Sequence, residues 1–181
     1  MIREIKLDKR EMDLCLQEIA RGDNNSFAKL YQETRKGVFS FIYGYCQNYH
    51  MAEDITQTVY IKVKANITKY NMGTDARAWI FQIAKNTTLN ELKKSKREKS
   101  TDFAMDKTFS ESGYEMSDTP VFEAIQKALN DEERQIVIMH IIWGFKHREI
   151  AQMLELALGS VLWKYNNAIK KLQKYLTKED A

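Results

Sequence analysis

A carboxylate, an amide and an aliphatic side chain share one stripe of a predicted helix near the middle of the first half of the chain. Asp54, Gln57 and Ile61 are separated by three and four residues, so a helix brings them onto one face. The ring of Tyr60 lies beside them, and a neighbouring stripe that includes Ile55 is apolar and predicted to be buried. A mixed stripe of this kind can bind a partner protein through hydrogen bonds and apolar contact. Spacing alone favours an ordinary solvated face over a docking surface.

Aromatic, amide and basic side chains are concentrated in residues 70–97. Gly73 supplies the backbone freedom for a turn, and Thr74 or Asp75 can cap the helix that follows. Cations bind phosphates, while unpaired bases can stack on rings or be held by amides. The alternative is a solubilising helix end with Trp79 in the core. The candidate contacts to unpaired DNA are Tyr70, Asn71, Thr74, Asp75, Trp79, Lys85, Asn86, Asn90, Lys93, Lys94 and Arg97.

The last predicted helix, residues 160–177, carries amides, a Leu-Trp pair and lysines on its outward face. From Lys164 to Lys178 there are five lysines and no acid. A short predicted helix at 146–154 precedes it, which gives the pair helix-turn-helix proportions. In a major groove, amides can read adenine, apolar groups can meet thymine methyls and lysines can hold phosphates. An ordinary amphipathic helix, or a surface for a partner protein, is the alternative. The candidate contacts to duplex DNA are Ser160, Leu162, Trp163, Lys164, Asn166, Asn167 and Lys170.

These residues are carried by a chain whose composition favours helices throughout. Its 181 residues are 44% hydrophobic, with only one proline and seven glycines, and no sustained alternating pattern argues for a sheet. Helical periodicity predicts a four-helix domain over residues 8–99 and a second domain ending in the helix-turn-helix over 120–178. Residues 100–119 carry five acids against one lysine and show no period, so they are predicted to be a flexible acidic linker.

No catalytic, metal or cofactor site is expected. Cys15 and Cys46 are isolated from one another, no Gly-rich phosphate loop or nucleophile motif is present, and His50, His140 and His147 are scattered. Of the histidines, His140 is predicted to be a core residue and His147 a surface residue. An enzyme is therefore the weakest hypothesis. No apolar run reaches membrane-spanning length and the N-terminus is too charged for a signal peptide, so a soluble cytoplasmic protein is expected.

The order of these features resembles the small bacterial sigma factors of the extracytoplasmic-function (ECF) group, within the sigma-70 family. In the first half the resemblance rests on residues 52–57 (AEDITQ) with Tyr60, on Trp79-Ile80, and on residues 83–86 (IAKN) followed by a basic run. The matching residues of the second half are Leu129, Glu133, Arg134, Gly144, Glu149, Ile150, Ala151, Leu154, Gly159, Ser160, Val161, Lys164, Ala168, Lys171 and Leu172. Together the two halves cover residues 10–176.

The resemblance implies a function in transcription initiation. Region 2 would bind the β′ clamp helices of core RNA polymerase through Asp54, Gln57, Tyr60 and Ile61, and its following loop and helix would melt and read the minus-ten promoter element. Region 4, which lies near the β flap in this family, would read the minus-thirty-five element through the last helix. The resemblance also implies that an anti-sigma protein can be a partner.

Some residues depart from the family pattern. Glu155 stands where many members have glycine, Ala157 is a poor N-cap, and Leu162-Trp163 replaces a basic–Ser pair. The contact to the upstream element is therefore expected to be more apolar than usual. A helix-turn-helix regulator that acts without polymerase is the alternative function, although it leaves the first half of the chain without a role.

Overall fold

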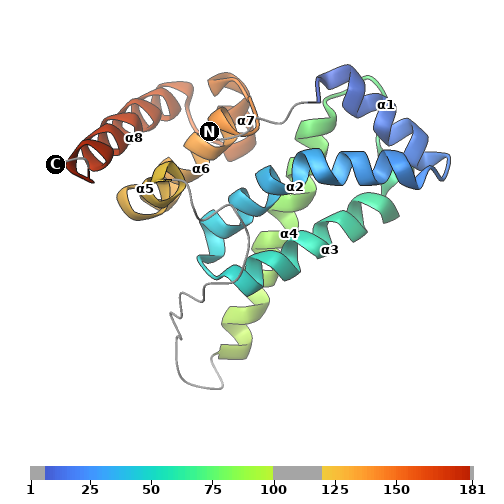
Figure 1. Cartoon of the computed structure of the whole chain (residues 1–181), viewed down its shortest axis with the longest axis horizontal. Helices are drawn as coiled ribbons and strands as arrows, with labels where there is room; N and C mark the ends of the chain where they lie inside the picture. The colour runs from blue at the N-terminus through green and yellow to red at the C-terminus, as the bar shows by residue number, and fades with distance from the viewer. Residues whose placement is uncertain (1–6, 100–119, 180–181) are drawn as a thin grey trace. The chain divides into compact units, whose positions relative to one another are not determined.

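The computed structural model describes residues 7–99 and 120–179, and every regular element in these ranges is helical (Figure 1). This confirms the all-α prediction. The predicted linker, residues 100–119, lies outside the described residues. The helices are α1 (Lys9–Ala20), α2 (Asn24–Cys46), α3 (Tyr49–Ala65), the short 3-10 helix η1 (Ile67–Lys69), α4 (Ala76–Lys99), α5 (Pro120–Ala128), α6 (Asp131–Ile141), α7 (His147–Leu154) and α8 (Leu158–Glu179). They fall into two compact units, α1–α4 and α5–α8.

In the first unit, short polar residues set where each helix begins. Asp8 and Glu11 form a reciprocal capping box at α1, Asp23 caps α2, and Asn48 caps α3. Helix α2 packs against α1, α3 and α4, and α3 also packs against α4. Buried aromatic rings fill the centre, where Phe41 of α2 lies 4.3 Å from Phe81 of α4 between ring centroids.

In the second unit, α8 packs against each of α5, α6 and α7. Gly144, with a positive φ of 67°, turns the chain after α6 and lets both Trp143 and Phe145 be buried. Helix α7 ends at Glu155, whose φ of 57° places a non-glycine residue in the left-handed region. Helix α8 then begins at Leu158, two residues earlier than the sequence predicts.

Within the described ranges, no helix is both long enough and apolar enough to cross a membrane.

Candidate functional site

Three of the four residues predicted to bind a partner protein lie together on the open face of α3. Asp54 and Gln57 are exposed, and the side chain of Ile61 is 68% exposed, more than the other large aliphatic residues that point to solvent. We call Asp54, Gln57 and Ile61 the docking stripe. An acid, an amide and an uncovered aliphatic group in one row supply hydrogen-bonding and apolar contacts for a single partner surface.

The fourth of these residues, Tyr60, lies behind the docking stripe and is buried. Its side chain is 3% exposed, and its hydroxyl lies 2.7 Å from Oγ1 of Thr34 on α2. Because Thr34 donates its own hydrogen to the carbonyl of Leu30, Tyr60 donates to Thr34. The Tyr60 ring packs edge-on against Tyr31 and Phe27, and burial raises the pKa of its hydroxyl. Tyr60 therefore fixes α3 on α2, behind the docking stripe.

Tyr70 and Asp75, which are predicted to contact DNA, make structural contacts within the first unit. Tyr70 is buried, its hydroxyl donates to the carboxylate of Asp13 on α1, and its ring lies 5.2 Å from that of Trp79. Burial and this hydrogen bond raise the pKa of Tyr70 to about 12. Asp75 caps α4 by accepting from the backbone N–H of Arg77 at 3.0 Å, and it also pairs with the Arg77 guanidinium.

Between these two anchors, residues 71–74 form an exposed loop, which we call the reading loop. Asn71 and Thr74 are exposed, and Gly73 adopts a positive φ of 83°. The Thr74 hydroxyl closes the loop by donating to the carbonyl of Asn71 at 2.7 Å. The structure adds Met72, which is 49% exposed at the loop and which the sequence reasoning missed. The sequence signal for Met72 is an apolar residue directly before the glycine of the predicted turn.

Helix α4 presents amides and then cations along its exposed side. Asn86 and Asn90 are exposed, and Asn86 Oδ1 accepts a hydrogen bond of 3.1 Å from Gln82. Trp79 and Lys85 are half-buried. The exposed cations that follow are Lys93, Lys94 and Arg97.

In the second unit, the outward face of α8 is partly apolar. Leu162 is 41% exposed and Trp163 is 66% exposed. Asn166 and Lys170 are exposed as well, and spacings of three, four and seven residues put all four on one face. We call Leu162, Trp163, Asn166 and Lys170 the recognition face. Ser160 is exposed at the beginning of the helix.

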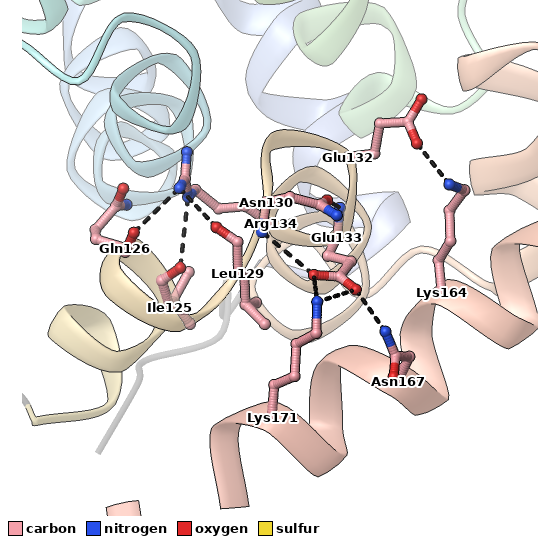
Figure 2. A network of polar contacts seen from close by, with 10 residues as sticks. All are labelled: Ile125, Gln126, Leu129, Asn130, Glu132, Glu133, Arg134, Lys164, Asn167 and Lys171. Carbon is pink, nitrogen blue, oxygen red and sulfur yellow. Dashed lines mark hydrogen bonds and ion pairs between the residues drawn. The ribbon is translucent and has the colours of Figure 1, made fainter. Parts of the chain in front are cut away.

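Lys164 and Asn167, which are also predicted to contact DNA, are directed away from the recognition face. Figure 2 shows both pointing toward α6, where Lys164 pairs with Glu132 at 2.6 Å and Asn167 Nδ2 donates to Glu133 at 2.8 Å. The carboxylate of Glu133 is buried and also accepts from Lys171 at 2.8 Å. These contacts fix the rotation of α8 about its own axis.

The buried carboxylate of Glu133 remains charged. Burial opposes its ionisation, but the ammonium of Lys171, the N–H of Asn130 and the amide of Asn167 together hold the pKa below its ordinary value. The N–H of Glu133 in turn donates to Asn130 Oδ1 at 2.9 Å, which completes the capping box of α6. One side chain thus begins α6 and anchors α8.

Arg134, the next residue, joins α6 to α5. Its guanidinium donates to the carbonyl oxygens of Leu129 at 2.9 Å, Gln126 at 3.1 Å and Ile125 at 3.4 Å (Figure 2). Helix ends leave such carbonyls without partners inside the helix, so Arg134 acts as a side-chain cap for α5. Arg134 is 3% exposed, and its guanidinium also donates to the carboxylate of Asp131.

The two histidines of this unit form a cluster with Tyr165. The rings of His140 and His147 stack at 4.2 Å, and Tyr165 lies edge-on to both. His140 Nδ1 donates to the carbonyl of Phe145 at 2.8 Å. His147 is half-buried rather than a surface residue, and desolvation together with the neighbouring His140 lowers its pKa.

Known proteins are similar to this chain in sequence and in fold. Residues 30–98, from α2 to the end of α4, match the family model described as sigma-70 region 2, and this range contains the docking stripe and the reading loop. The chain is 24% identical over 178 residues to the ECF RNA polymerase sigma factor SigW of Bacillus subtilis, covering 89% of this chain and 94% of that protein. It is 26% identical over 132 residues to the factor EcfG of Rhodopseudomonas palustris, covering 71% and 73% of the two chains.

A solved structure shows the same fold. The sigma factor RpoE of Bartonella quintana, determined in complex with the anti-sigma factor NepR, superposes with a TM-score of 0.67 at 21% identity, covering 83% of this chain and 96% of that one.

Proposed function

We propose that this chain, an ECF-type sigma factor of the sigma-70 family, binds core RNA polymerase and directs it to start transcription at specific promoters. The observation that carries the proposal is the occurrence of two recognition surfaces in one chain. A docking stripe and a reading loop lie within a matched sigma-70 region 2, and a helix-turn-helix with a lysine-bearing outward face lies in the second unit. A regulator that acts alone on duplex DNA would have no use for the first surface.

The docking stripe is the proposed contact with the β′ clamp helices. Asp54 and Gln57 supply hydrogen bonds, and Ile61 supplies apolar area that is exposed in the free protein. Covering such a side chain contributes about 1.5–3 kcal/mol when burial is complete. Tyr60 acts indirectly, because it holds α3 in place from the buried side.

The reading loop and α4 are the proposed site for the minus-ten element. Asn71 and Thr74 offer polar groups to a base that has left the duplex, and Met72 offers an apolar one. Lys93, Lys94 and Arg97 hold the phosphates of the separated strand. Unstacking a base costs a few kcal/mol, which binding to polymerase and to the loop would offset.

The recognition face of α8 is the proposed contact with duplex DNA at the minus-thirty-five element, with the second unit close to the β flap. In this scheme the protein forms and breaks no covalent bond, needs no cofactor and works in the cytoplasm beside polymerase. We also propose that an anti-sigma protein can bind it, since the similar RpoE structure contains one. Purification at native expression without any bound inhibitor would count against that partner.

Binding to core polymerase tests the proposal. We expect the full chain to bind core enzyme, and the double variant Asp54→Ala/Gln57→Ala to bind at least about fivefold more weakly, since two interfacial hydrogen bonds contribute about 1–3 kcal/mol together. Gln32→Ala, which removes an exposed amide from α2, is the matched control and should bind like the wild type. Equal affinity of the double variant and the control would refute the docking stripe.

A further inference from the structure

The recognition face is smaller and more apolar than the sequence predicts. Glu132 binds Lys164 and Glu133 binds Asn167, so both side chains point toward α6. They are therefore not part of the outward face of α8. What remains at the beginning of α8 is dominated by the Trp163 and Leu162 side chains, of which 66% and 41% are exposed. Leu158, 43% exposed, continues this apolar surface by one helical turn.

The charge of α8 indicates a nucleic acid as the occupant of this face. Between Leu158 and Thr177 the helix has four lysines and no acid. Of these, two are exposed. Lys170 belongs to the recognition face, and Lys174 lies one helical turn further along α8. The phosphates of a duplex neutralise these cations while the base edges meet the apolar pair, whereas a second protein would need acidic residues placed to match them.

The major groove presents only one apolar group, the C5-methyl of thymine. The Leu162 side chain has no hydrogen-bonding group, and the Trp163 indole has a single N–H donor. Neither side chain can form the two hydrogen bonds with which arginine reads guanine. Asn166, one turn beyond Leu162, has the amide that pairs with the N6 and N7 positions of adenine. Leu162, Trp163 and Asn166 therefore match A·T base pairs, and Lys170 is assigned to the phosphates.

We propose that Leu162 and Trp163 are specificity-determining residues that contact thymine C5-methyl groups, so that this protein selects an A·T-rich upstream promoter element. The inference rests on the proposed function, because it requires α8 to enter the major groove. It goes beyond that function because it assigns the class of sequence that is read. The inward-facing Lys164 and Asn167 make no base contact in this arrangement.

The test uses polymerase holoenzyme assembled with the full chain and a DNA library in which ten upstream base pairs are random. Selected sites should be rich in A·T pairs. Each selected thymine is then replaced by uracil, which removes the methyl group and leaves base pairing unchanged. Burial of one methyl group corresponds to about a fourfold change in affinity, so uracil at a contacted position should weaken binding about fourfold.

The uracil effect should depend on the protein side chain. In Trp163→Ala or Leu162→Ala, at least one position should lose its sensitivity to uracil. Because both side chains are exposed, their removal leaves the packing of α8 intact. Gln173→Ala, an exposed change three helical turns beyond Leu162, is the control and should keep the full effect.

Four results would overturn the inference. Selection of G·C-rich sites, or wild-type binding that ignores uracil, contradicts methyl recognition while leaving the proposed function intact. Binding that is independent of the upstream sequence in the wild type would remove both the inference and the role proposed for region 4. A uracil effect of equal size in the wild type and in both alanine variants would assign methyl recognition to other residues.

Discussion

Truncation of Glu133 should loosen α8 far more than truncation of its neighbour Glu132. The two acids stand side by side in the first turn of α6, so they interact equally with the helix dipole. They differ in surroundings, because the Glu133 side chain is 3% exposed while that of Glu132 is 57% exposed. A comparison of Glu133→Ala with Glu132→Ala therefore isolates the buried network from general charge effects.

The magnitude follows from the contacts that would be lost. Glu133→Ala leaves the Asn130 N–H and the Asn167 amide without their acceptor, at a cost of about 1 kcal/mol each. The ion pair with Lys171 adds only about 0–1 kcal/mol, since the Lys171 side chain is 41% exposed and can be solvated again. The sum is about 2–3 kcal/mol. For Glu132→Ala, which loses one surface pair with Lys164, we expect about 0–1 kcal/mol.

Native-state hydrogen exchange of the full chain, resolved by peptide, measures the opening free energy of each helix separately. Peptides from α6 and α8 should lose about 2–3 kcal/mol of protection in Glu133→Ala, while peptides from α2 and α3 serve as an internal reference and should not change. Equal losses in the two variants would refute the view that the Glu133 network holds α8 in position.

Three further predictions concern the helix-turn-helix and are measured by thermal unfolding. Glu155→Gly should stabilise the second unit by about 1 kcal/mol, because Glu155 has a φ of 57° at the end of α7; no gain would mean that its side chain makes an offsetting contact. Ala157→Ser should add about 1 kcal/mol, since Ala157 precedes α8 and cannot accept from its first N–H groups; Ala157→Val is the control and should add nothing. The pKa of His147 is lowered in the folded state, so the unfolded chain binds a proton more readily. The contribution of His147 to the free energy of unfolding is therefore complete above its ordinary pKa of about 6.5, and it declines as the pH falls below that value. His147→Gln should reduce the loss of stability between pH 7.5 and 5.5. A loss equal to that of the wild type would contradict this prediction.

Sequence periodicity predicts the helices and the face on which a residue lies, but not how deeply that face is covered. The spacing of Asp54, Gln57 and Ile61 predicts that they share one stripe of a helix, and the structure shows that this stripe is exposed. Tyr60 directly precedes Ile61 but is covered by α2, where Thr34 accepts its hydroxyl hydrogen. That partner is 26 residues away, and no local pattern indicates it.

The same reason explains why other predicted contact residues are held by their own unit. Tyr70 is bound by Asp13, which lies 57 residues earlier, and Asn167 is bound by Glu133, which lies 34 residues earlier. In each case a polar or aromatic residue that looks suited to DNA is satisfied by a distant part of its own unit. The start of α8 was misplaced because Ala157 provides no capping signal.

The most direct test of the central claim is run-off transcription. Core RNA polymerase from the source organism is supplied with genomic fragments that include the promoter of this protein's own gene, with and without the protein. The account predicts discrete transcripts that require the protein and that disappear with Asp54→Ala/Gln57→Ala. Absence of transcripts and of core binding, with duplex DNA binding retained, would contradict the account and identify a regulator that acts without polymerase.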